Sequence, residues 1–399
     1  MPDLPKRTLG RTGLEVTTLG YGTMELRGAP RGRDVSEEQA ERILNTVLDA
    51  GINFIDTSID YGVAEERIGR YIAHRRSEYV LASKCGCLAG TLASNPPPPR
   101  PGQRSPHVFT AENIVQGVEQ SLERMKTEYL DLVQFHASPS KAELEEHGGL
   151  QAVQELQRRG KVRFIGISGT LPNLHEQIAM GVFDTFQIPY SALERPHEAL
   201  IEQASRAGAG IIIRGGVAKG GPGKEQGDSW EAWQRAGLDD LLGGMSRMEF
   251  ILRFTVSLPD LDTTIVGTIN PDHLRDNLNA LAAGPLPADV YTEAKRRLAD
   301  AGSVPIAARP AGVIRRSGAH RSDRLAPRAA PARGAGPPVA PRLLPPLPAG
   351  RRGTRDAHHP WRSSAAAPMP QGWSIDSRSV RGSNWGIGRP SCAAAAGEM

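Results

Sequence analysis

The chain reads Ile52-Asn53-Phe54-Ile55-Asp56, and Tyr61 follows five residues later in Asp60-Tyr61-Gly62. Two further apolar runs end on a polar residue: Tyr79–Ser83 leads into Lys84, and Leu130–Phe135 leads into His136. Short apolar runs separated by longer amphipathic ones are typical of buried parallel strands. Because the carboxyl ends of parallel strands meet on one face, we expect an acid, a phenol, an amine and an imidazole to converge there.

Strand-like runs recur along most of the chain. The eight candidates are Leu19–Gly22, Ile52–Ile55, Val80–Ala82, Leu130–Phe135, Val162–Ile167, Thr185–Ile188, Ile211–Ile213 and Thr264–Val266. Eight strand–helix units over this length predict an α/β fold, a (β/α)8 TIM barrel. The alternative is a doubly wound open sheet, but no Gly-x-Gly-x-x-Gly lies between an early strand and a helix. Thr8–Thr18, with two glycines, predicts a short N-terminal β-hairpin that closes the bottom of the barrel.

Helix starts between the strands carry recognisable signals. Ser36 precedes an apolar stripe and has Gln39 three positions later, as in a capping box. Thr110 stands before a second helical pattern, and Pro271 stands where the first turn of another helix should begin. These signals support alternating strands and helices from about residue 19 to residue 281.

The composition changes after Ser303. Residues 305–399 hold 15 arginines and four acidic residues, whereas the rest of the chain holds 33 basic and 40 acidic residues. The tail is rich in Ala, Pro, Arg and Gly and cannot bury enough apolar surface to offset its ordering entropy. We therefore predict a barrel domain over residues 1–303 and a disordered tail over residues 304–399. A read-through product is the alternative origin of this tail.

Three cysteines, Cys85, Cys87 and Cys392, cannot form a disulfide framework, which favours the reducing cytoplasm. The spacing Cys85-Gly86-Cys87 is not that of a zinc or thioredoxin motif, so we expect no metal and expect these thiols only to pack near the mouth of a site. No run is long and apolar enough to predict a membrane span. The start of the chain has no apolar segment that would make it a signal peptide.

The four polar residues at the predicted strand ends suit proton transfer to a carbonyl oxygen. A phenol such as Tyr61 is a weak acid, with a reference pKa of about 10, but a nearby cation favours its ionised form. Lys84 can supply that charge, Asp56 can hold Lys84, and His136 can donate to a substrate oxygen. None of them supplies a hydride, so a cofactor is required.

These motifs resemble the aldo-keto reductase family over roughly residues 9–281. The matching pieces are Gly51–Thr57 with Tyr61-Gly62, Ser83-Lys84, Asp131–His136, Gly160–Ser168, and Val266-Gly267-Thr268 with Asn270-Pro271. The resemblance implies a barrel that binds a nicotinamide dinucleotide and reduces an aldehyde or ketone to an alcohol. It also implies that Tyr61 is the general acid, that Lys84 and Asp56 tune it, and that His136 orients the carbonyl.

The resemblance also implies cofactor positions. Ser168 and Gln187 would hold the carboxamide, although the family's usual asparagine after that serine is Gly169 here. Arg214 replaces the aromatic residue that stacks on the nicotinamide, and the loop from Gly215 and Gly216 to Gly220 matches a pyrophosphate position. The residues that match the adenosine 2′-phosphate end are Gly267, Thr268, His273 and Asn277. The resemblance favours NADPH, with NADH as the alternative.

Some alternatives stay open at this level. A cofactor-sensing regulatory barrel with little turnover would carry the same residues. Arg214 is equally suited to pair with a nearby acid, and the glycine-rich stretch Gly215–Gly227 can be a plain loop. The basic tail has few aromatic residues, so we expect no specific nucleic-acid partner. The expected partner is a small carbonyl substrate; the sequence does not predict which one, nor the oligomeric state.

Overall fold

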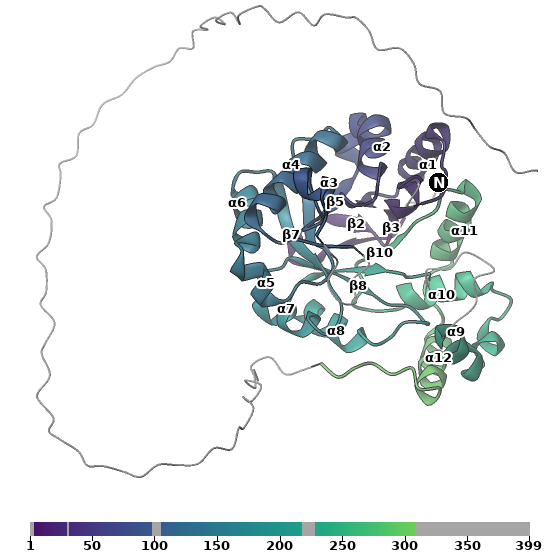
Figure 1. Ribbon diagram of the computed structural model, residues 1–399. Helices are drawn as coiled ribbons and strands as arrows, with labels where there is room; N and C mark the ends of the chain where they lie inside the picture. The colour runs from purple at the N-terminus through teal and green to yellow at the C-terminus, as the bar shows by residue number, and fades with distance from the viewer. Residues whose placement is uncertain (1–3, 30–31, 98–104, 218–227, 309–399) are drawn as a thin grey trace, which may run out of the picture. The chain divides into compact units, whose positions relative to one another are not determined.

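Eight parallel strands close into a barrel in the computed structural model, which describes residues 4–29, 32–97, 105–217 and 228–308 (Figure 1). The strand order is β10-β3-β4-β5-β6-β7-β8-β9. The strands are β3 (Leu19–Gly22), β4 (Phe54–Asp56), β5 (Val80–Cys85), β6 (Leu130–Phe135), β7 (Val162–Ser168), β8 (Thr185–Pro189), β9 (Gly210–Arg214) and β10 (Thr263–Val266). The barrel prediction is confirmed, and closure between β10 and β3 rules out the open doubly wound sheet.

Helices surround the barrel and cover its outer face (Figure 1). In the described residues they are α1 (Glu37–Asp49), α2 (Ala64–Tyr71), α3 (Gly90–Ser94), α4 (Ala111–Met125), α5 (Lys141–Glu146), α6 (Gly149–Arg158), α7 (Leu174–Met180), α8 (Glu198–Arg206), α9 (Asp228–Arg235), α10 (Arg247–Val256), α11 (Pro271–Ala282) and α12 (Ala288–Asp300). Ser36 and Gln39 form the predicted capping box at α1, and Thr110 caps α4. Pro271 occupies the first turn of α11.

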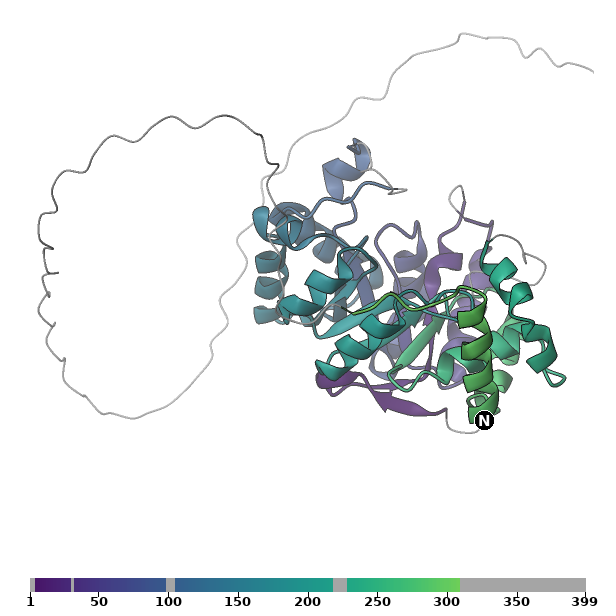
Figure 2. The same cartoon turned by 90° about the horizontal axis from the view of Figure 1, so that it is seen from below.

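A two-stranded hairpin precedes the barrel, as predicted. Its strands β1 (Lys6–Thr8) and β2 (Glu15–Thr17) are antiparallel, and the hairpin lies at one end of the barrel (Figure 2). Leu9, Leu14 and Val16 pack in one buried cluster with side chains of the barrel strands, among them Phe54 and Leu132. The hairpin therefore closes the amino-terminal end of the barrel interior.

Each strand faces two apolar environments because side chains alternate along it. On β6, Leu132 belongs to the small interior cluster, whereas Val133 and Phe135 belong to the larger core between strands and helices. The same alternation directs Gln134 and the following His136 toward the interior at the carboxyl end of the barrel. The hairpin closes the opposite end, so the polar strand-end residues gather at the end away from the hairpin.

The units of the chain are Met1–Gly318 and Ala319–Met399, and all described residues belong to the first. Residues 304–308 follow α12 and contact the barrel, since the Ile306 amide donates to the Pro196 carbonyl at 2.9 Å. The rest of the predicted disordered tail lies outside the described residues. In the described ranges, no helix combines the length and apolar character that crossing a membrane requires.

Candidate active site

A buried ion pair joins two adjacent strands at the carboxyl end of the barrel. Lys84 Nζ donates to Asp56 Oδ1 at 2.6 Å and to the Thr57 carbonyl at 2.8 Å. Both side chains are only 1 % exposed. Burial by itself lowers the pKa of Lys84, but the attraction of Asp56 and Tyr61 and the hydrogen bond to Asp56 together outweigh it, and the pKa lies above the ordinary value. Lys84 therefore stays charged in the barrel interior.

Two glutamines complete the surroundings of the Asp56 carboxylate. Gln134 Nε2 donates to Asp56 Oδ2 at 3.0 Å, and Gln187 Nε2 donates to the same oxygen at 2.8 Å. Ser168 Oγ donates to Gln187 Oε1 at 3.0 Å. Gln134 was not among the predicted site residues, although its position two residues before His136 on a strand indicates the same face. The predicted Ser168 and Gln187 are thus brought into one network with Asp56.

Tyr61 lies beside this pair. Lys84 Nζ is 5.2 Å from the centre of the Tyr61 ring, and the ring of His136 meets it edge-on with 6.4 Å between centroids. Burial raises the pKa of Tyr61; the charge of Lys84 offsets part of this rise, and Asp56 and Asp60 add to it. The expected lowering by Lys84 is therefore present but is outweighed, so Tyr61 is fully protonated at neutral pH and can act as a proton donor.

His136 follows β6 and is held by its backbone, whose amide donates to the Cys85 carbonyl at 3.0 Å. Burial lowers the pKa of His136 well below its usual value, and the charges of Lys84, His107 and Arg214 lower it further. The imidazole is therefore neutral near pH 7. A neutral imidazole has one N–H donor and one lone pair, which suits a hydrogen bond to a carbonyl oxygen.

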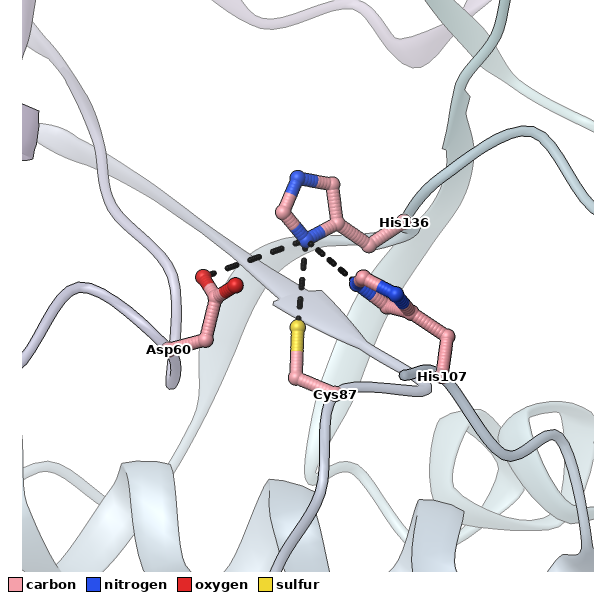
Figure 3. A group of neighbouring side chains, drawn as sticks. All are labelled: Asp60, Cys87, His107 and His136. Atoms are coloured by element: carbon pink, nitrogen blue, oxygen red, sulfur yellow. Dashed lines mark hydrogen bonds and ion pairs between the residues drawn. The ribbon is translucent and has the colours of Figure 1, made fainter. Parts of the chain in front are cut away.

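Three more side chains surround His136 (Figure 3). His136 Nδ1 lies 3.1 Å from Cys87 Sγ, 3.3 Å from His107 Nε2 and 4.0 Å from an Asp60 carboxylate oxygen. The expectation that the thiols only pack near the site holds for Cys85. Its side chain belongs to the larger core between the strands and the helices. Cys87 instead faces His136. Sequence reasoning missed Asp60 and His107 because they come from loops, whose paths depend on tertiary contacts.

Arg214 ends β9 on the same rim. Burial lowers its pKa, and the nearby negative charge of Glu194 together with Tyr61 and Asp56 offsets part of that. Its guanidinium thus lies within electrostatic reach of the residues expected to carry the chemistry. Gly215 follows with a φ of 71°, and a Cβ on Gly216 would come within 2.3 Å of Thr264 Oγ1. Residues 218–220 of the predicted pyrophosphate loop lie outside the described residues.

The remaining predicted cofactor residues follow β10, which pairs with β9. A Cβ on Gly267 would come within 2.7 Å of the Gly22 carbonyl, so only glycine fits there without movement. The Thr268 carbonyl accepts from the Tyr21 hydroxyl at 2.7 Å. His273 and Asn277 are one turn apart on α11, His273 exposed and Asn277 half-buried.

These residues fit a nicotinamide dinucleotide in two respects. The Ser168 hydroxyl and the Gln187 amide oxygen keep lone pairs that can accept from a carboxamide. Gly215 is partly exposed and Gly267 is exposed, so the ends of these adjacent strands offer backbone without a side chain, where a phosphate can approach closely. At Gly169, where the resemblance implies an asparagine, a Cβ would lie 2.6 Å from Oε1 of the buried Gln177.

Comparisons with known proteins identify the family of this chain. The aldo/keto reductase family model matches residues 18–236. An uncharacterized oxidoreductase of Bacillus subtilis, YqkF, is 26% identical over 298 residues, covering 70% of this chain and 91% of its own. A second oxidoreductase of the same organism, YrpG, is 29% identical over 308 residues, covering 68% and 90%.

A solved structure gives the same result. The holo form of the aldo-keto reductase AKR11C1 from Bacillus halodurans is 25% identical, with a TM-score of 0.63, and covers 74% of this chain and 96% of its own. The family match spans more than half of the sequence and includes the strands that carry the predicted chemistry. The chain therefore belongs to the aldo/keto reductase family of NAD(P)H-dependent oxidoreductases.

Proposed function

We propose that this protein reduces an aldehyde or ketone to an alcohol with NADPH, and that Tyr61 donates the proton. The observation that carries the proposal is the buried Asp56–Lys84 pair beside the protonated Tyr61. A fixed positive charge next to a phenol stabilises the phenolate that remains after proton transfer. Because this charge is already in place and dehydrated, it needs little reorganisation during the reaction.

The carbonyl oxygen would lie between Tyr61 and His136, whose rings face each other edge-on. Neutral His136 would donate a hydrogen bond and orient the carbonyl, and Tyr61 would transfer its proton to the oxygen as negative charge develops there. Asp56 keeps Lys84 charged and fixed, while Gln134 holds the second carboxylate oxygen.

The cofactor, when bound, supplies the hydride to the carbonyl carbon. Ser168 and Gln187 would hold its carboxamide, Arg214 would lie against the nicotinamide, and Gly215 and Gly216 would face the pyrophosphate. Gly267 and Thr268 would contact the adenosine end together with two residues of α11, His273 and Asn277. Arg275, exposed in the same helix, lies 2.7 Å from Asp272, and its charge would favour NADPH over NADH if it turns from that carboxylate to a 2′-phosphate.

The decisive variant is Tyr61→Phe. Purified protein is supplied with NADPH and a panel of aldehydes and ketones, and the nicotinamide absorbance is followed. We expect turnover to fall at least about 100-fold in the variant, as is usual when a general acid is lost. Nucleotide affinity, measured by quenching of protein fluorescence, should stay within about twofold because the hydroxyl is not assigned to the cofactor.

Two results would contradict the proposal. Unchanged turnover in Tyr61→Phe would remove Tyr61 from the acid role. Tight nucleotide binding by the wild-type protein without oxidation of NADPH by any carbonyl would favour the cofactor-sensing barrel instead. The same pair of measurements with NADH in place of NADPH decides the cofactor preference.

A further inference from the structure

We propose that Asp60, Cys87, His107 and His136 form a binding site for a divalent transition metal, with zinc as the best fit. Their potential ligand atoms all lie within 4.8 Å of one another. Thiolate, imidazole and carboxylate are the ligands that zinc takes in proteins, and a thiolate disfavours magnesium and calcium. Four protein ligands make a closed site, which is the structural rather than the catalytic type.

The spacing of the donors suits a tetrahedral ion. Zinc–ligand bonds of about 2.0–2.3 Å place neighbouring ligand atoms about 3.3–3.7 Å apart in a tetrahedron. The structure has His136 Nδ1 at 3.1 Å from Cys87 Sγ, at 3.3 Å from His107 Nε2 and at 4.0 Å from an Asp60 oxygen. These three distances bracket the required edge, and no edge of the cluster exceeds 4.8 Å, so shifts of up to about 1 Å would complete the coordination.

Hydrogen bonds orient the two imidazoles for metal binding. His107 Nδ1 lies 3.0 Å from the Ser105 carbonyl, which can only accept, so Nδ1 carries the hydrogen and Nε2 presents its lone pair to the cluster. A backbone carbonyl behind a ligating histidine is the usual outer-shell partner in metal sites. Figure 3 shows the second ring nitrogen of His136 pointing away from the other three side chains.

This arrangement poses a conflict that a cation resolves. If His136 is to donate from Nε2 to a substrate, its neutral ring has a lone pair at Nδ1, and that lone pair then faces the lone pair of His107 Nε2. A metal ion between them accepts both lone pairs. The bound ion would also fix His136 in the form with hydrogen on Nε2.

The backbone holds two of the ligands in place. Cys87 and His107 form an isolated antiparallel bridge, and the Val108 amide donates to the Gly86 carbonyl at 2.8 Å. Asn113 joins both segments, because its Nδ2 donates to the Cys87 carbonyl at 3.0 Å and to the Val108 carbonyl at 2.8 Å. Asn113 is almost completely buried. The two loops are thus tied together by the first turn of α4.

A hydroxyl supports the other side of the cluster. Ser58 Oγ donates to Asp60 Oδ1 at 2.9 Å and lies 3.5 Å from Cys87 Sγ.

The simplest alternative is a metal-free hydrogen-bonded cluster in which the Cys87 thiol donates to His136 Nδ1. That cluster would bind no metal tightly, so direct binding measurements decide between the two. The tautomer argument for His136 rests on the proposed function, but the geometry of the four donors does not, and the test uses no turnover.

The experiment uses the reduced full-length protein, stripped of metal with a chelator. Zinc affinity is measured by competition with a chromophoric chelator, and cobalt(II) is titrated as a spectroscopic probe. We expect one tight site per chain, the intense visible bands of tetrahedral cobalt, and a near-ultraviolet thiolate-to-cobalt charge-transfer band. Zinc binding should release protons, since the thiol must ionise to become a ligand.

Variants assign the site. Cys87→Ser should abolish the charge-transfer band. His107→Ala and Asp60→Asn should both weaken zinc binding. For His107→Ala we expect a loss of at least about 100-fold, because the loss of an outer-shell partner alone costs about 10- to 100-fold. Cys85→Ala and Cys392→Ser are the matched thiol controls, and exposed His74→Ala is the histidine control; all three should leave both signals unchanged. Circular dichroism of each metal-free variant confirms that it is folded.

Either of two results would overturn the proposal. One is the absence of tight zinc or cobalt binding by the wild-type protein. The other is retention of the charge-transfer band in Cys87→Ser or its loss in Cys392→Ser, which would assign the thiolate ligand to the tail. Asp60 lies in a loop with 18% of its side chain exposed, and Asp60→Asn keeps the size of the side chain, so this variant tests the site even if His107→Ala unfolds.

Discussion

The Asp56 carboxylate links several strands of the barrel. One carboxylate accepts from Lys84, Gln134 and Gln187, which come from three different strands. A buried carboxylate is tolerable only when its charge is paired and its lone pairs are satisfied. Substitutions around Asp56 should therefore affect both folding and cofactor binding, and the two effects can be separated residue by residue.

Lys84→Met should destabilise the fold strongly. It removes the positive partner and leaves Asp56 buried with only amide donors, which typically costs about 3–5 kcal/mol in the free energy of unfolding. The double variant Asp56→Asn/Lys84→Met should recover part of this loss because no charge stays buried. Urea denaturation of the three proteins measures the effect.

A matched control for this prediction is Lys161→Met. Lys161 Nζ lies 3.0 Å from Glu119, but both side chains are about one-third exposed, at 34% and 39%. Exposed ion pairs contribute at most about 1 kcal/mol. Equal losses in Lys84→Met and Lys161→Met would mean that the buried pair has no special role in stability.

Gln187→Leu and Gln134→Leu form a matched pair. Each variant removes one hydrogen bond to Asp56 Oδ2, but only Gln187 also contacts Ser168 and is proposed to hold the carboxamide. We expect the dissociation constant for NADPH to rise roughly 5- to 30-fold in Gln187→Leu, as the loss of one or two hydrogen bonds of about 1 kcal/mol predicts. Gln134→Leu should change it by less than about twofold. Fluorescence titration measures both, and equal shifts would argue against a cofactor contact of Gln187.

Much of the catalytic end of the site could be predicted from the sequence, for a physical reason. Asp56, Lys84 and His136 stand at or beside strand ends, and strand direction in a parallel barrel fixes where those ends meet. His107 and Asp60 could not be predicted in this way, because a loop's path follows from contacts such as those of Asn113 and Ser58. The net effect on the Tyr61 pKa was also beyond the sequence, since it depends on depth of burial.

At the scale of elements, one carboxylate joins the hairpin to the barrel. Asp262 Oδ2 accepts from the Gly10 amide at 3.1 Å and from the Ile211 amide at 2.9 Å. Gly10 follows β1 and Ile211 lies in β9, so this residue holds the hairpin against the end of the barrel. Burial raises the pKa of Asp262 from 3.8 to about 6, which outweighs the two backbone hydrogen bonds.

Asp262 should make stability depend on pH. Because its folded pKa is the higher one, the folded protein binds more protons between about pH 4 and pH 6; its contribution is complete below pH 4 and is lost as pH rises through about 6. Asp262→Asn keeps an oxygen that can accept both amides and removes the charge. We expect the free energy of unfolding of the variant, relative to that of the wild type, to be about 1–2 kcal/mol higher at pH 8 than at pH 5. Urea denaturation at both pH values measures this, and parallel changes in the two proteins would contradict it.

The elements themselves followed closely from the sequence. All eight predicted strands form, because each apolar run is buried along most of its length and has turn residues around it. Boundaries were less predictable: β4 starts at Phe54 rather than Ile52, since the Asn53 side chain is engaged by the hairpin, accepting from the Thr17 amide and donating to the Glu15 carbonyl. The short helix α3 has no side-chain cap to announce it.

At the scale of the whole molecule, the barrel should be independent of the tail. A chain ending at residue 308 should keep its free energy of unfolding within about 0.5 kcal/mol and its turnover unchanged, because the composition of the removed part cannot form a core. Denaturation and NADPH oxidation, compared with the full-length protein, test this. A loss of either would show that the tail contributes to the barrel or its site.

The truncation point matters and provides its own control. Arg195 is 3% exposed and donates to the Ser303 carbonyl at 3.0 Å, and the Ile306 amide bonds to Pro196. A chain ending at residue 302 removes both contacts. It should lose about 1–3 kcal/mol, because a buried guanidinium loses an acceptor.

Closure of the barrel between β3 and β10 also sets an order of events during synthesis. Leu19 pairs with Thr264, and the Gly10 amide reaches Asp262, 252 residues later. A ribosome delivers the amino-terminal strand long before its second neighbour, so β3 must wait with one edge unpaired until β10 has left the exit tunnel. The nascent chain therefore exposes a strand edge for most of its translation, and this is the interval in which a chaperone that covers such edges has the most to protect.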